Sequence, residues 1–151
     1  MAIVALTNAT PSGVPEALTA QFADLVQFGE VREDWYGLYS GVFAEMEKPV
    51  GSLVGKRPPA SPAPAAPPAT YVGTYANDYW GPARVTEKDG KLMLALGTKL
   101  NVPLEHWDGN VFTFKFVTEN APPGTISKAT FDGNNLVLEY YDELGKGTFT
   151  K

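Results

Sequence analysis

The chain has 151 residues, of which 44% are hydrophobic and 19% charged, a length and composition that suit one or two small globular domains. Its net charge of -5 argues against nucleic acid or an anionic membrane surface as a partner, because both require a basic face. The absence of cysteine excludes disulfides and thiolate chemistry, and no apolar run approaches the roughly 18 residues of a membrane span.

The chain opens on an apolar stretch, residues 3–9, that has the composition of a β-strand. A turn is predicted at residues 10–13, where Thr, Pro, Ser and Gly follow one another. A single strand leaves its backbone N–H and C=O groups without partners. We therefore expect the chain to begin inside a larger domain. The basic region and long apolar run of an export signal are not visible at its start.

Two amphipathic helices are predicted next. The first opens at Pro15, after Ser12 or Gly13 as a cap, and ends at Gly29. The second follows Asp34 as its N-cap and carries one wide apolar stripe. That stripe consists of Trp35, Leu38, Tyr39, Val42, Phe43 and Met46. Two helices and one strand cannot enclose so many apolar side chains. We therefore expect a missing domain, the rest of the chain or a second copy to cover them, and we expect self-association.

Proline and alanine dominate residues 48–70, which we interpret as a linker between an N-terminal part (residues 1–47) and a C-terminal domain (residues 71–151). Proline fixes φ and lacks a backbone donor, so this stretch should be extended and semi-rigid. A docking site for a partner that reads proline motifs is the alternative interpretation.

The C-terminal domain is predicted to be antiparallel β throughout, because turn signals recur at the spacing typical of barrels and sandwiches. The expected strands are residues 71–76, 82–87, 91–96, 101–107, 111–117, 125–131, 136–142 and 147–151. Short strands joined by hairpins favour an up-and-down barrel, which closes and so leaves no exposed edge. Leu and Phe alternate along the middle strands, so we expect side chains to fill the barrel rather than a roomy ligand pocket.

Residues 3–8, the following turn and the helix opening at Pro15 resemble the last strand and closing helix of the class C β-lactamase and penicillin-binding-protein fold. In that family a strand reading roughly G-I-V-x-L-x-N precedes the terminal helix. Residues 71–75 (Y-V-G-T-Y) and 90–94 (G-K-L-M-L) resemble the small lipocalin-like barrel that follows many β-lactamase-related serine peptidases and esterases. The order of closing strand, closing helix, Pro-rich linker and barrel is the more specific part of the resemblance.

The resemblance implies a mainly β chain: a small eight-stranded antiparallel up-and-down (lipocalin-like) barrel, preceded by one strand and two α-helices. It also implies that residues 1–47 are the tail of a hydrolase domain and that an upstream hydrolase domain is the partner of the barrel. A periplasmic or exported parent protein fits the family. The implied role is accessory and non-catalytic: assembly, or the shaping of substrate access. A stand-alone barrel that binds a small apolar ligand is the alternative.

No catalytic motif of that family is present. The family needs a nucleophilic serine in S-x-x-K, and none of the five serines (Ser12, Ser40, Ser52, Ser61 and Ser127) has lysine three positions on. Tyr75-Ala76-Asn77 fits a Y-x-N motif, but without the serine and lysine we interpret it as a strand end and turn. We therefore predict that this chain is not an enzyme by itself.

His106 is the only histidine, and alternation along its strand puts the neighbouring Glu105 on the opposite face. We therefore predict no metal site and no cofactor. Four aromatic-type side chains near turns form the candidate contact surface: Tyr79, Trp80, His106 and Trp107. Exposed aromatics are enriched at interfaces because they bury a large area and keep a polar group. The alternative is that Tyr79 and Trp80 close one end of the barrel.

Overall fold

The computed structural model describes residues 1–9, 11–118 and 120–151, which divide into two compact units. The first unit comprises Met1–Lys48 and Thr118–Pro122, and the second comprises Pro49–Val117 and Pro123–Lys151. None of the helices in this described part of the chain has the length and apolarity needed to cross a membrane.

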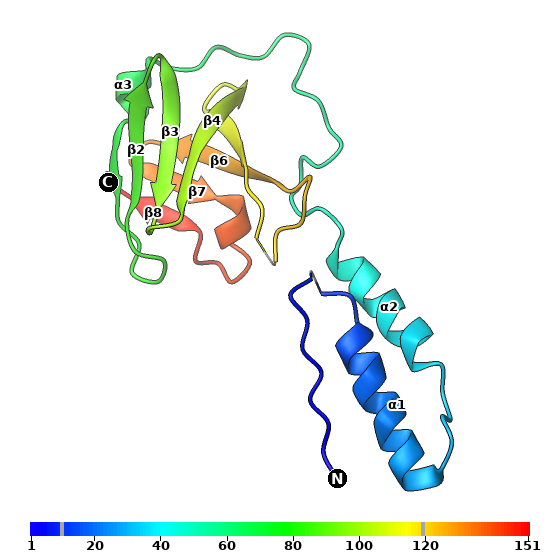
Figure 1. Ribbon diagram of the computed structural model, residues 1–151. Helices are drawn as coiled ribbons and strands as arrows, with labels where there is room; N and C mark the ends of the chain where they lie inside the picture. The colour runs from blue at the N-terminus through cyan, green and yellow to red at the C-terminus, as the bar shows by residue number, and fades with distance from the viewer. Residues whose placement is uncertain (10, 119) are drawn as a thin grey trace. The chain divides into compact units, whose positions relative to one another are not determined.

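Two helices, α1 (Val14–Phe28) and α2 (Trp35–Met46), lie side by side as a hairpin in the first unit (Figure 1). The Asp34 side chain accepts the Gly37 N–H at the start of α2, and the Gly29 N–H closes α1 on the Leu25 carbonyl. Gly13 precedes α1 with φ +74°, and a Cβ there would lie 2.8 Å from the Cβ of Tyr39. The chain therefore needs glycine where α1 starts against α2. Both predicted helices are confirmed.

The predicted strand at residues 3–9 was wrong. Residues 1–9 have no regular secondary structure, and no described strand pairs with them. A strand exists only through hydrogen bonds to a neighbour, so an apolar composition alone does not make one. Of the turn predicted at residues 10–13, Thr10 lies outside the described residues.

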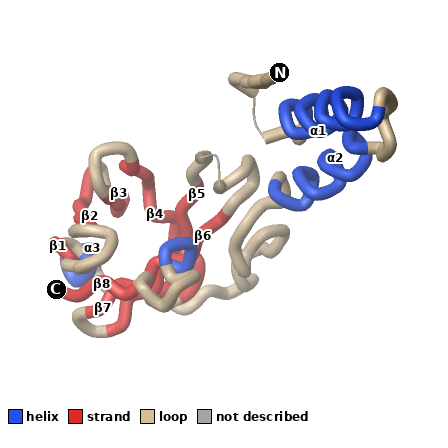
Figure 2. Tube along the Cα trace, turned by 90° about the horizontal axis from the view of Figure 1, so that it is seen from below, coloured by secondary structure: helices blue, strands red, loops and turns tan. Residues whose placement is uncertain are grey.

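The second unit begins its regular structure with the short helix α3 (Pro68–Tyr71), and eight strands follow. These are β1 (Gly73–Tyr75), β2 (Ala83–Lys88), β3 (Lys91–Leu96), β4 (Leu100–Asp108), β5 (Val111–Lys115), β6 (Ile126–Asp132), β7 (Asn135–Leu138) and β8 (Thr148–Thr150). Each strand pairs antiparallel with the next, in the order of the chain. Figure 2 shows them running round a ring in which β1 and β8 are neighbours.

An isolated bridge between Ala76 and Thr150 closes the ring. Ala76 and Thr150 exchange two backbone hydrogen bonds, with N···O distances of 2.7 Å and 2.9 Å. The barrel is therefore nearly closed, and the predicted mainly β, up-and-down fold is confirmed. The predicted strand 136–142 ends early, because a 3-10 turn, η1 (Glu139–Tyr141), takes the chain out of the sheet after Leu138.

Side chains fill the interior of the barrel, as the alternation of apolar residues predicted. Leu94, Phe114, Leu136 and Phe149 are at most 1% exposed. Tyr71 packs its ring 4.6 Å from that of Phe131 and 5.1 Å from that of Phe112, as measured between centroids. Each fully buried side chain of this kind contributes about 1.5–3 kcal/mol to folding.

Candidate contact surfaces of the barrel

The loop between β1 and β2, residues 77–82, is here called the aromatic loop. The side chain of Asn77 organises it with four hydrogen bonds. Its oxygen accepts the N–H groups of Tyr79 (2.9 Å) and Trp80 (2.7 Å). Its amide nitrogen donates to the carbonyls of Lys146 and Thr148, both at 2.8 Å. One side chain therefore shapes the aromatic loop and joins it to the loop before β8.

The aromatic rings of this loop differ in exposure. Tyr79 is 60% exposed and Trp80 is 38% exposed, and their rings meet edge to face at 4.8 Å. The Trp80 indole N–H donates to the Tyr141 carbonyl at 3.0 Å, and the Trp80 ring packs edge to face on that of Tyr141. Burial raises the pKa of the Tyr141 phenol, and neighbouring Tyr140 adds to the shift. Trp80 is thus an anchor on the barrel, whereas Tyr79 faces solvent.

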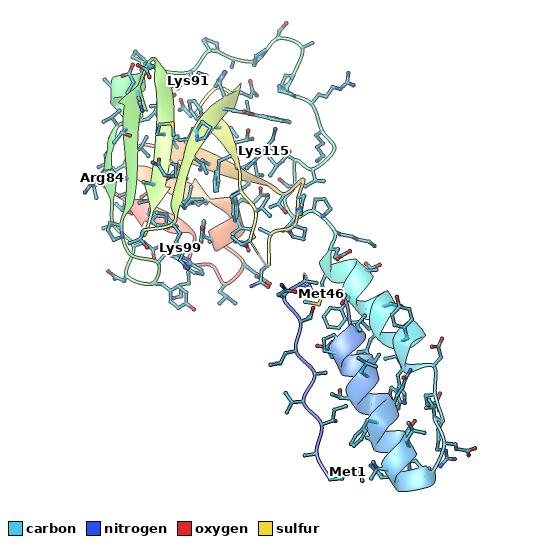
Figure 3. All side chains as sticks on the ribbon, in the orientation of Figure 1. Met1, Met46, Arg84, Lys91, Lys99 and Lys115 are labelled. Carbon is cyan, nitrogen blue, oxygen red and sulfur yellow. The ribbon has the colours of Figure 1, made fainter. Side chains whose placement is uncertain are left out.

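Two grooves flank the aromatic loop. The first, here called the seam groove, follows the junction of β1 and β8 and is lined by Ala76, Asn77, Asp78, Tyr79, Gly145, Lys146, Thr148 and Thr150. The second lies against Trp80 and includes Thr74 and Arg84. Arg84 points outward from β2 in Figure 3. The loop therefore presents one ring to each groove.

The other predicted contact residues lie at the opposite end of the barrel. Successive connections of an up-and-down barrel alternate between its ends, so the β1–β2 and β4–β5 loops are separated. Lys91, the first residue of β3, and Lys99, which follows its end, mark these two ends in Figure 3. His106 and Trp107 precede the β4–β5 turn. The four residues therefore do not form one continuous surface.

His106 is tied to its own turn. Its Nε2 lies 3.0 Å from the Gly109 carbonyl, and its ring packs edge to face on Phe112 at 5.4 Å. Trp107 is half-buried where the β4–β5 register shifts between His106 and Asp108. Among the described residues, no group of three or more His, Cys, Asp or Glu side chains is placed to hold a metal ion.

The Pro/Ala-rich segment contacts this same end of the barrel. We call residues 63–71 the strap. Ala63 donates its N–H to Asp108 Oδ1 at 2.7 Å, and its carbonyl accepts the Gly109 N–H at 2.8 Å. The Tyr71 hydroxyl accepts the Ala66 N–H and donates to Asn110 Oδ1, both at 2.7 Å. The strap is therefore fastened to the β4–β5 turn.

A second anchor lies at the start of the Pro/Ala-rich segment. Val50 donates its N–H to Thr125 Oγ1 at 3.1 Å and accepts the Ile126 N–H at 3.0 Å. Glu139 accepts the N–H groups of Ser52 (3.2 Å) and Lys128 (3.1 Å). A free spacer would not make the contacts of Val50 and Ser52. Sequence reasoning missed them because Val50 and Thr125 are 75 positions apart and Ser52 and Glu139 are 87 positions apart.

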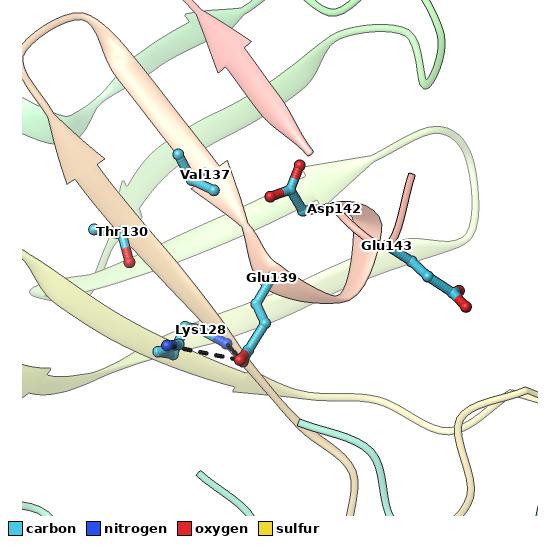
Figure 4. A pocket seen from close by; sticks show the side chains of 6 residues that line it. All are labelled: Lys128, Thr130, Val137, Glu139, Asp142 and Glu143. Atoms are coloured by element: carbon cyan, nitrogen blue, oxygen red, sulfur yellow. Dashed lines mark hydrogen bonds and ion pairs between the residues drawn. The ribbon is translucent and has the colours of Figure 1, made fainter. Parts of the chain in front are cut away.

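Glu139 also lines a groove with Lys128, Thr130, Val137, Asp142 and Glu143 (Figure 4). Its Oε1 lies 3.6 Å from the Lys128 ammonium. Burial alone would raise the pKa of Glu139, but hydrogen bonds from Ser52 and Lys128 and the charge of Lys128 together bring it below its usual 4.5. The carboxylate is therefore ionised at neutral pH and serves as an anchor rather than as a base.

These features define a small β-barrel domain with a filled core, a fastened strap and exposed aromatics at a loop. Residues 57–137, more than half of the chain, match the family described as "Domain of unknown function (DUF3471)". A solved structure described as the C-terminal domain of penicillin binding protein Rv0907 is 57% identical, with a TM-score of 0.60. That match covers 69% of this chain and 99% of the other. No curated protein matches. The chain belongs to this family of penicillin-binding-protein-related C-terminal domains.

Proposed function

We propose that the chain is a non-catalytic accessory domain of a β-lactamase-related serine hydrolase, acting in its assembly or in shaping substrate access. The observation that supports this most is the 57% identity to a penicillin-binding-protein C-terminal domain over 99% of that domain. The filled core also supports it over a stand-alone carrier of small apolar ligands, since a carrier of that kind needs interior space.

Residues 1–47 are, in this proposal, the closing part of a class C-like hydrolase domain, residues 48–70 connect it to the barrel, and residues 71–151 form a lipocalin-like accessory barrel. The apolar face of the helical hairpin supports this division. Leu18, Leu25 and Leu38 are each at least half exposed. Such a face favours burial against a hydrolase domain or a second copy of the chain.

Catalysis then depends on residues outside this chain. The surroundings of Ser52 show why we do not expect a nucleophilic serine in this chain. Its hydroxyl and its backbone N–H both interact with Glu139, whose pKa is lowered. A carboxylate of lowered pKa is a weak general base, so it does not activate a serine for attack. We expect the purified chain to turn over neither a chromogenic β-lactam nor a p-nitrophenyl ester.

A domain exchange tests the accessory role. The C-terminal domain of penicillin binding protein Rv0907 would be deleted or replaced by this barrel, and the rate of acylation by a fluorescent penicillin and the solution mass would be measured. We expect deletion to change one of these two quantities and replacement to restore it. Unchanged acylation and mass after deletion would overturn the accessory role. Labelling of this chain alone by the penicillin would overturn its non-catalytic nature.

A further inference from the structure

The seam groove is a built feature rather than a gap between loops. Asn77 joins its two walls, because the same side chain fixes Tyr79 and Trp80 on one side and holds the carbonyls of Lys146 and Thr148 on the other. The Gly81 N–H adds a further bond to the Asn77 carbonyl at 3.0 Å. The loop is therefore ordered before any ligand arrives, which reduces the entropy cost of binding.

Tyr79 is the exposed ring of this ordered loop. Although it meets the Trp80 ring edge to face, it leaves 60% of its surface exposed, so most of its apolar area stays in contact with water. Trp80 supports it from the side, and Tyr141 in turn supports Trp80. The chain thus holds the Tyr79 ring in one place at the groove instead of burying it. A rigid, solvent-facing aromatic is typical of a binding surface.

The other side chains of the seam groove are polar and of mixed type. They offer a carboxylate (Asp78), an ammonium group (Lys146) and the hydroxyls of Thr148 and Thr150. The Thr150 hydroxyl donates to Asn135 Oδ1 at 2.9 Å, so toward a ligand it is an acceptor. With one acidic and one basic group, the groove has no net charge that would select an ion. Its volume of about 550 Å³ falls in the range of about 300–1,000 Å³ that small-molecule sites occupy.

We infer that the seam groove binds a neutral oligosaccharide, with a sugar ring stacked on Tyr79. A sugar ring combines an apolar C–H face with a rim of hydroxyls that both donate and accept. The Tyr79 ring matches that face, and Asp78, Lys146 and the two threonines match the rim. A peptide would need a row of free backbone donors and acceptors, but Ala76 and Thr150 already pair with each other here. The inference is independent of the accessory role proposed above.

Titrations of the full chain with cellotetraose, chitotetraose and the peptide tetra-alanine, followed by the backbone amide resonances, test the inference. We expect one or both sugars to shift the resonances of residues 77–80 and 145–148 at millimolar concentration. The shift should be insensitive to added sodium chloride, because the ligand is uncharged. Shifts caused by tetra-alanine alone would assign a peptide surface and overturn the inference, as would the absence of any sugar-dependent shift.

Variants of Tyr79 test whether sugar binding depends on stacking against its ring. Tyr79→Ala should weaken sugar binding about tenfold or more, whereas Tyr79→Phe keeps the ring and should retain it. Tyr36→Ala is the matched control, because Tyr36 is 57% exposed on α2 of the first unit and is not one of the residues that line the groove. Equal affinity in Tyr79→Ala and the unmodified chain would overturn the inference. Unchanged circular dichroism of each variant checks that the barrel is intact.

Discussion

Asp24 on α1 accepts a hydrogen bond from the indole N–H of Trp35 on α2, at 2.7 Å. The same carboxylate oxygen accepts the backbone N–H of Arg32 at 3.0 Å. Asp24 is only 8% exposed, so these contacts replace water as partners of its charge. The bond from Trp35, then that from Arg32, lowers the pKa of Asp24 below 3.8. One carboxylate thus fastens both helices and the turn between them.

The helical hairpin should therefore lose stability in acid. Folding lowers the pKa of Asp24. Its contribution to the stability of the hairpin is therefore fully present above pH 3.8 and is lost as the pH falls through its lower pKa in the folded state. At neutral pH, the Asp24→Asn variant should lose its helical circular dichroism at a lower temperature than the unmodified chain. Its helix stability should no longer fall in acid as that of the unmodified chain does. Glu30→Gln, at an exposed position between the helices, serves as the control. Identical helix melting of Asp24→Asn and the unmodified chain would contradict the role of Asp24.

Tyr71→Phe tests how the strap is held. The change keeps the ring that packs on Phe112 and Phe131 but removes the hydroxyl that bridges Ala66 and Asn110. We expect a loss of about 1–3 kcal/mol in the free energy of unfolding by urea, since two hydrogen bonds lose their partner. Tyr36→Phe, at an exposed position, should change it by less than about 0.5 kcal/mol. Equal stability of both variants would show that the bridge is unimportant.

Gly51→Ala tests the Val50 part of the second anchor, at the start of the Pro/Ala-rich segment. Gly51 has φ +121°, and an added Cβ would overlap the Ile126 carbonyl oxygen. Gly55 also has a positive φ, +72°, but open space around it. Gly55→Ala should cost only the backbone strain, about 1–2 kcal/mol. Gly51→Ala should in addition release Val50 from β6, which faster hydrogen exchange of the Ile126 amide would reveal. Equal exchange in the two variants would contradict this anchor.

The helices and strands could be predicted from the sequence because they depend on local patterns. Gly29 and Asp34 end and begin helices through their own backbone or side chain, and Leu92, Leu94 and Leu96 alternate along β3 as a half-buried strand requires. The strand at residues 3–9 could not be settled in this way, since a strand depends on a partner elsewhere.

The anchors and the arrangement of the site depend on distant residues. Ser52 meets Glu139 across 87 positions, so no local pattern announces that contact. Composition alone was enough to select Tyr79, Trp80, His106 and Trp107 as candidates. These residues lie at two ends of the barrel because successive connections between neighbouring strands alternate from one end to the other, and this follows only from the strand order. The role of Asn77 in building the seam groove likewise appears only when the β1–β2 and β7–β8 loops meet.

Glu139 should make the second anchor sensitive to pH. Hydrogen bonds from Ser52 and Lys128 keep the pKa of Glu139 below 4.5 although burial would raise it. The contribution of this carboxylate to stability is therefore fully present above pH 4.5 and is lost as the pH falls through its lower pKa in the folded state. The amide proton shifts of Ser52 and Lys128 should follow this transition. Glu139→Gln should abolish it, and Glu143→Gln, at an exposed position nearby, should leave it unchanged. A transition of the Ser52 amide above pH 4.5 would contradict the ionised anchor, because it would mean that folding raises the pKa of Glu139.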